Sequence, residues 1–262
     1  MIGQIFAIAR NTFREAVRNR IFASLVFFAL LMMGITLAVS SASLNEEVRL
    51  MKDVGFFLIS TFSVLIAVFT GVNLVYKELE RKTIYTVMPK PIWRWQFLLG
   101  KYLGLAATML IQVAVMTSVL GLLIPLVGGE IGVELAQAGW LVFVEVCVVL
   151  GVAMVFSSFS TPFLSGLLTL GVFAVGRFAD VLSTLRLGAP EERTPLSEAI
   201  SATVRAVAEV TPDLSLYDVT PNLVYGRPIT ADYMLHASGL GLTYVALALL
   251  LSAVLFHRRD FT

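Results

Sequence analysis

Residues 21–40 read IFASLVFFALLMMGITLAVS, an uninterrupted run without one charged side chain. A helix rises about 1.5 Å per residue, so a run of this length crosses a hydrocarbon core about 30 Å thick. Five further stretches have the same character, and together they predict an all-α integral membrane protein with six transmembrane helices. The predicted spans are Ile21–Ser40, Val54–Tyr76, Phe97–Leu126, Ala138–Phe159, Pro162–Val181 and Leu235–Phe256.

The composition of the whole chain agrees with this interpretation. Of its 262 residues 58% are hydrophobic and 14% are charged, and the mean hydropathy is +0.86. Soluble domains have roughly 45–50% apolar residues and about 25% charged residues. One globular core of this length cannot bury the excess, which excludes a water-soluble enzyme. The balance of 19 Lys and Arg against 18 Asp and Glu gives no basis for a nucleic-acid partner. A single cysteine, Cys147, permits neither a disulfide framework nor a thiolate metal site.

The distribution of charge predicts the orientation, because basic residues are retained on the cytoplasmic side of a membrane. With both termini inside, the cytoplasmic segments carry 12 Lys and Arg against four acidic residues, and the outer segments carry seven against 13. The N- and C-termini of the chain are therefore expected in the cytoplasm. A cleaved signal peptide at residues 21–40 is the alternative, but the run is longer than the usual 7–15 apolar residues.

Residues 1–20 predict an amphipathic helix that precedes the transmembrane domain at 21–262. Seven apolar residues share one face of this helix beside a row of arginines, which favours a helix lying on the membrane surface in contact with lipid phosphates. Such a helix acts either as an anchor that orients the first span or as an elbow helix that packs against a cytoplasmic partner. The apolar residues are Ile2, Ile5, Phe6, Ala9, Phe13, Ala16 and Val17, and the arginines are Arg10, Arg14 and Arg18.

The cytoplasmic loop at 77–96 carries the most informative pattern. Lys77–Met88 lacks Gly and Pro and predicts a short charged helix, which Pro89 ends and after which Pro91 opens the next helix. Trp93 and Trp95 are typical of an interface anchor. A loop that serves only to hold positive charge inside needs no exposed apolar surface, so a docking role is favoured. That surface consists of Leu79, Ile84, Val87 and Met88.

The chain resembles the permease subunits of ABC-2 type transporters, closest in layout to those of copper-site maturation and gliding-motility systems. The resemblance covers nearly the whole chain in element order, and Lys82 stands where many relatives have Gly. The matching motifs are the basic N-terminal helix, Glu78-x-Glu80-Arg81-x-Thr83, Met88-Pro89-x-Pro91-Ile92, Gly100-Lys101, Tyr244 and Phe256-x-Arg258-Arg259-Asp260-Phe261.

The resemblance implies that Glu78–Met88 is a coupling helix, which docks into a separate ATP-hydrolysing subunit. The docking residues would be Glu78, Leu79, Glu80, Arg81, Thr83, Ile84, Val87 and Met88. The chain has no Gly-x-x-x-x-Gly-Lys-Ser/Thr motif, since Gly100-Lys101 is followed by Tyr102. We therefore expect no cofactor on this chain and ATP with Mg²⁺ on the partner, and two copies of the chain would form a two-fold symmetric dimer.

Glu145 is an ionisable residue inside the fourth predicted span, in its outer half. Such a residue costs roughly 2.5–3.5 kcal/mol on insertion scales and usually faces protein or water. Arg177, near the outer end of the fifth span, lies at comparable depth and can pair with it across a tight helical hairpin. The two residues are candidates for the substrate path; a structural ion pair or a protonated carboxyl is the alternative.

The outer loop at 182–234 holds five of the nine prolines and is too polar to span. Thr194 and Pro195 open a predicted amphipathic helix that ends at Pro212 and rests on the outer membrane surface or re-enters it. The resemblance implies an outer gate here, and the length of the loop leaves room for a periplasmic accessory protein. An inert surface loop is the alternative.

The leading functional hypothesis is an exporting permease subunit that is not itself an enzyme. An intramembrane enzyme would need a base positioned beside a nucleophile or metal, which the sequence around Glu145 does not supply. A passive channel or a membrane scaffold is the remaining alternative.

Overall fold

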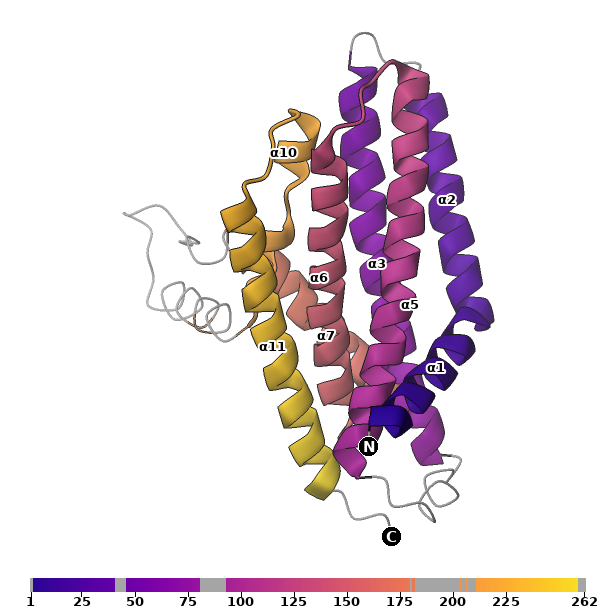
Figure 1. Ribbon diagram of the computed structural model, residues 1–262, viewed down its shortest axis with the longest axis vertical. Helices are drawn as coiled ribbons and strands as arrows, with labels where there is room; N and C mark the ends of the chain where they lie inside the picture. Colours follow the sequence, from indigo (N-terminus) through magenta and orange to yellow (C-terminus); the bar gives the residue numbers. More distant parts are fainter. Residues whose placement is uncertain are drawn as a thin grey trace.

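The computed structural model describes residues 2–40, 46–80, 93–179, 181, 203, 206 and 211–258. This part of the chain is helical and contains no strand, so the predicted all-α class is confirmed for it (Figure 1). The elements in chain order are α1 (Ile2–Val17), α2 (Arg20–Ser40), α3 (Glu47–Glu80), α5 (Arg94–Leu123), η1 (Ile124–Val127), α6 (Val133–Ser157), α7 (Pro162–Arg177), η2 (Ser215–Tyr217), α10 (Thr220–Val224) and α11 (Ala231–Arg258).

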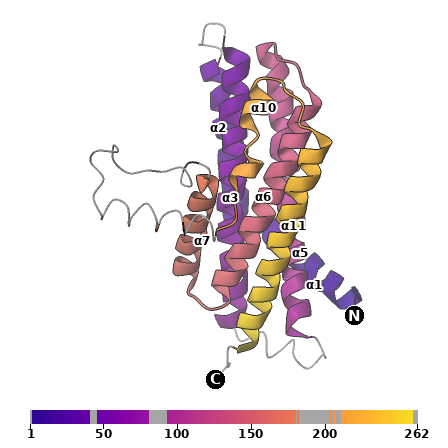
Figure 2. The same ribbon diagram turned by 90° about the vertical axis from the view of Figure 1, so that its left-hand side faces the viewer.

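Five of these helices are long and apolar enough to cross a membrane. They contain the first, second, third, fourth and sixth spans expected from the sequence. Their candidate membrane stretches are Arg20–Ala38, Glu47–Val72, Trp95–Val127, Val133–Ser157 and Ala231–Leu255. The start of α1 and the end of α11 lie at the same end of the bundle (Figures 1 and 2), as an even number of crossings requires.

The fifth predicted span differs from expectation. Its helix, α7, has 16 residues and ends at Arg177, not at Val181; at about 1.5 Å per residue it rises about 24 Å, less than a full crossing. Figure 2 shows α7 beside only part of the height of the bundle. The predicted tight turn between the fourth and fifth spans is present, because α6 ends at Ser157 and Pro162 opens α7 in its first turn.

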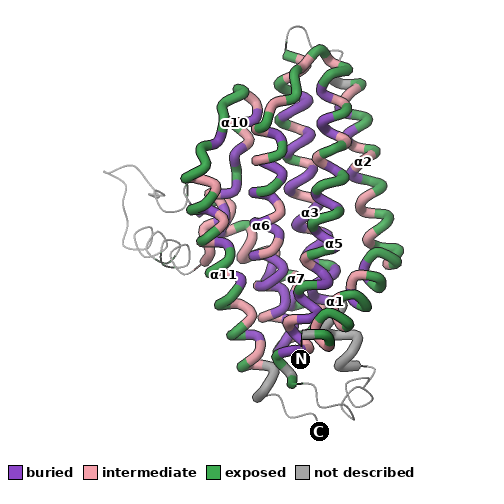
Figure 3. Tube along the Cα trace, in the orientation of Figure 1, coloured by how far each residue is buried: buried purple, intermediate pink, exposed green. Residues whose placement is uncertain are grey.

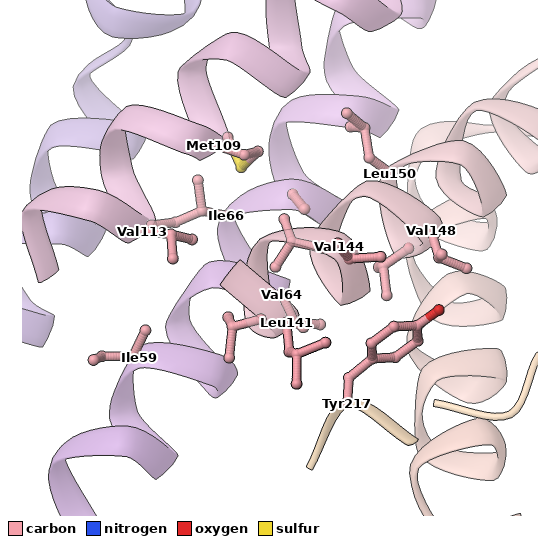
Figure 4. Packing of buried hydrophobic residues seen from close by; sticks show 14 of the residues in the cluster. Ile59, Val64, Ile66, Met109, Val113, Leu141, Val144, Val148, Leu150 and Tyr217 are labelled. Atoms are coloured by element: carbon pink, nitrogen blue, oxygen red, sulfur yellow. The ribbon is translucent and has the colours of Figure 1, made fainter. Parts of the chain in front are cut away.

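The core of the bundle is formed by α3 and α6. In their most apolar stretches 67% and 72% of the residues are buried, against 17% in α2 and in α11 (Figure 3). Ile59 and Ile66 of α3, Met109 of α5 and Leu141 and Val148 of α6 belong to one buried hydrophobic cluster (Figure 4). The outer helices α2 and α11 instead leave large apolar side chains exposed, as lipid contact requires. These side chains include Phe27, Leu31, Ile35, Leu242, Leu247 and Leu250.

The N-terminal helix α1 packs against the start of α5. Two glycines of α5 permit the contact, because a Cβ on Gly100 would lie 2.8 Å from Ile8 Cβ and a Cβ on Gly104 would lie 2.6 Å from Thr12 Cβ. The buried face of α1 therefore includes Thr12 and Ala16. Phe6, predicted to belong to the same apolar stripe as Ala16, is 69% exposed, so α1 has one face for α5 and a second apolar face for lipid.

Candidate functional site

Glu145 is a fully buried carboxyl at the middle of α6. It lies twelve residues from either end of this helix, which places about 18 Å of helix on each side of it. Its side chain has no exposed area. A carboxylate at this depth needs compensating contacts from the protein, since neither lipid nor apolar side chains can solvate it.

Two side chains from other helices supply these contacts. Ser60 of α3 donates its hydroxyl hydrogen to Oε2 of Glu145 at 3.2 Å. Arg177 Nη1 donates to Oε1 of Glu145 at 2.9 Å, so the predicted pairing of Glu145 with Arg177 across the helical hairpin is confirmed. A role of the pair in a substrate path stays a prediction.

Arg177 also binds a second carboxylate, which the sequence analysis did not identify. Its Nη2 atom lies 3.0 Å from Oδ2 of Asp218. The other oxygen of Asp218, Oδ1, accepts hydrogen bonds from the hydroxyl of Thr220 at 2.6 Å and from its backbone N–H at 3.3 Å. Asp218 therefore links the end of α7 to the start of α10.

The backbone around Gly176 determines where Arg177 is placed. The carbonyl oxygen of Gly176 accepts a hydrogen bond from the backbone N–H of Leu214 at 3.0 Å. A side chain at Gly176 would meet the carbonyl oxygen of Pro212 and the side chain of Leu214. Residues 212–214 thus lie directly on the last turn of α7, where a continuing helix would otherwise run.

Tyr217 attaches the residues that follow Leu214 to helix α11. The ring is fully buried, and its hydroxyl donates to the carbonyl oxygen of Ala237 in α11 at 3.1 Å. Gly241, one turn further along α11, leaves room for the hydroxyl, since a Cβ there would lie 2.9 Å from it. We call residues 211–219 the return segment, because it leads from the level of the end of α7 toward α10 (Figure 2).

The four polar side chains form a graded network, which we call the Arg177 network: Ser60, Glu145, Arg177 and Asp218. Exposure of the charged side chains increases from 0% at Glu145 to 17% at Arg177 and 38% at Asp218. Two carboxylates share one guanidinium, whose terminal nitrogens point to different partners. The network joins α3, α6, α7 and the return segment at a depth where backbone polar groups need internal partners.

A second polar contact crosses the core between α3 and α5. Gln112 Nε2 donates to Oγ of Ser63 at 2.9 Å, and both side chains are buried. A hydrogen bond between helices is the common use of such a polar side chain inside a membrane. Among the residues that the structure describes, no group of three or more His, Cys, Asp or Glu side chains lies close enough together to hold a metal ion.

Of the predicted docking residues, the structure describes only the backbone of Glu78, Leu79 and Glu80. The backbone of Glu78–Glu80 forms the last turn of α3, continuous with the second span. Arg81, Thr83, Ile84, Val87 and Met88 lie outside the described residues, as does most of the predicted outer helix at 195–211. Trp93 and Trp95, both exposed, lie at the start of α5 as an interface anchor requires.

The bundle of membrane-length helices and the buried ion pair define a multi-pass membrane protein. Residues 6–261 match the family described as ABC-2 family transporter protein, so the chain belongs to this family of transporter permeases. The resemblance inferred from the sequence motifs is thereby confirmed. The family implies a partner, the ABC ATPase subunit. No curated protein matches the chain.

Proposed function

We propose that this protein is the permease subunit of an ABC-2 exporter in the bacterial inner membrane, driven by ATP hydrolysis on a separate subunit. Family membership over residues 6–261 is the observation that carries the proposal. In this arrangement the chain crosses the membrane six times, α7 and the return segment together making the fifth crossing. Both termini and the loop at 77–96 face the cytoplasm.

The length of α3 supports a mechanical link to the ATPase. The second span predicted from the sequence ends at Tyr76, whereas α3 continues as one helix to Glu80. The four residues after Tyr76 extend about 6 Å beyond that span. A continuous helix transmits displacement with little loss, so motion at Glu78–Glu80, the end of α3, reaches Ser60, which contacts Glu145.

The assembly that we propose contains two copies of this chain and two ATPase subunits. Each ATPase binds ATP and Mg²⁺ and receives one coupling helix in a surface groove. The substrate moves outward along a path between the two copies, and Glu145 with Arg177 borders that path. A periplasmic accessory protein binds the outer loop at 182–234.

The test replaces Glu78–Thr83 by a flexible Gly/Ser segment of equal length. We expect the chain to insert in the membrane and the ATPase to be lost on co-purification, because a flexible segment cannot fill the groove as a helix does. The control is a four-residue Gly/Ser replacement at Gly128–Ile131, the connection between η1 and α6 at the other end of the bundle. Unchanged ATPase recruitment in the Glu78–Thr83 variant would overturn the docking role; absence of any ATPase from the intact chain would favour a channel or a scaffold.

A further inference from the structure

The two ion pairs of Arg177 differ in how firmly the protein holds them. Glu145 is fully buried and has a second hydrogen bond from Ser60. Asp218 is 38% exposed, and water competes with the guanidinium for an exposed carboxylate. Separating Glu145 from Arg177 would leave a charge in the core without a partner. If one of the two pairs opens, it is therefore the pair with Asp218.

The position of Asp218 requires water at this depth. One guanidinium bridges Asp218 and Glu145, so the two carboxyl groups lie at nearly the same level of the bundle. A partly exposed carboxylate at the depth of a transmembrane helix faces water and not hydrocarbon. Irregular backbone, such as the return segment, is likewise tolerated there only against protein or a water-filled space.

We propose that the Arg177–Asp218 ion pair is a latch that closes the transport path at the middle of the bundle, at the inner end of a water-filled entry from the outer face. When the latch opens, Asp218 and the return segment move away from the end of α7 while Arg177 stays on Glu145. The proposal rests on the proposed function, because the ATPase-driven motion of α3 is what opens the latch. The route of that motion is the contact between Ser60 and Glu145.

Leu214 provides a reporter for the latch. Its side chain is 1% exposed and its backbone N–H is bonded to the carbonyl oxygen of Gly176, so it becomes accessible only when the return segment leaves α7. The parent for the experiment is Leu214→Cys in a Cys147→Ser background, purified with its ATPase and reconstituted in lipid vesicles. A membrane-impermeant maleimide added to the outer face labels the cysteine at a rate that reports opening.

Asp218→Asn tests the latch by removing its charge with little change of shape. We expect labelling about fivefold faster than in the parent, because a partly exposed ion pair shifts the equilibrium between closed and open states by about that factor. Arg177→Lys provides a second variant: a lysine nitrogen cannot replace two separate guanidinium nitrogens, so it keeps the buried partner Glu145 and releases Asp218, again with faster labelling. Asp232→Asn, an exposed carboxylate in the first turn of α11, is the matched control and should label as the parent does.

Trapping the complex with ATP and vanadate separates the latch from the proposed function. We expect trapping to accelerate labelling of the parent and to add little in Asp218→Asn. Equal labelling rates in the parent, Asp218→Asn and Arg177→Lys would overturn the latch. Faster labelling in both variants together with a parent that does not respond to nucleotide would support the latch and overturn its drive by ATP.

Discussion

Glu145 and Arg177 are 32 positions apart in the sequence, yet they meet with a nitrogen–oxygen distance of 2.9 Å. One lies at the middle of α6 and the other is the last residue of α7. The tight turn between these helices brings the two together, because Glu145 lies 12 residues before the end of α6 and Arg177 lies 15 residues after the start of α7. The second contact of Arg177, with Asp218, depends on the return segment lying against the last turn of α7.

Replacing only one member of this pair should lower the stability of the protein far more than replacing both. We expect Arg177→Met to lower the free energy of unfolding by about 3–5 kcal/mol, because the fully buried Glu145 loses its ionic partner and keeps only the hydrogen bond from Ser60. The double variant Glu145→Met with Arg177→Met should recover most of that loss, since two apolar side chains of similar length fill the same space. Thermal unfolding in detergent measures the stability of the purified single and double variants. Additive effects of the two substitutions would contradict the prediction.

Tight packing of α1 on α5 gives a second prediction. Gly104→Ala should destabilise this contact by about 1–3 kcal/mol, because the new Cβ would lie 2.5 Å from the carbonyl oxygen of Ala9 and 2.6 Å from Thr12 Cβ. Gly239→Ala in α11 is the matched control: nothing lies within 4 Å of its Cβ position, and alanine favours a helix by up to about 1 kcal/mol. Labelling of a Thr12→Cys reporter should rise with the first substitution and stay unchanged with the second.

The sequence predicts most of the helices correctly because membrane spans depend on long apolar runs, which are local. It could not predict the end of α7, since no helix-breaking Gly or Pro stands between Arg177 and Val181, whereas the helix stops at Arg177. A distant segment lies against this end: Leu214 donates its backbone N–H to the carbonyl oxygen of Gly176. No local pattern contains that contact.

The same limit applies to the candidate site. Glu145 and Arg177 stand out because a charge inside an apolar run is rare, and their pairing follows from the hairpin. Asp218 lies in a polar stretch where an acidic residue is ordinary, and Ser60 is one of many hydroxyl residues in the spans. The one available signal was the chemistry of arginine, since a guanidinium with five donors at membrane depth needs more than one acceptor.

The predicted orientation can be checked with two single cysteines in a Cys147→Ser background. Arg18 is exposed between α1 and α2, and Glu130 is exposed in the connection before α6. From the charge distribution we expect Arg18→Cys to react only from the cytoplasmic side and Glu130→Cys only from the outer side. An impermeant reagent applied to intact cells and to inverted vesicles distinguishes the two sides, and the reverse pattern would place the coupling loop outside.

The extension of α3 gives the last prediction, which concerns how the ATPase reaches the latch. Tyr76 and Lys77 lie in α3 where the predicted second span ends and the extension to Glu80 begins. Replacing both by glycine costs roughly 1 kcal/mol of helix stability at each position and turns a rigid connection into a hinge. The ATPase should still co-purify, because the docking residues are unchanged, but nucleotide should no longer accelerate labelling of Leu214→Cys. Replacing the same pair by alanine removes the same side chains and preserves the helix, so the nucleotide response should remain. A response that survives the glycine pair would mean that the motion reaches the Arg177 network by a route other than α3.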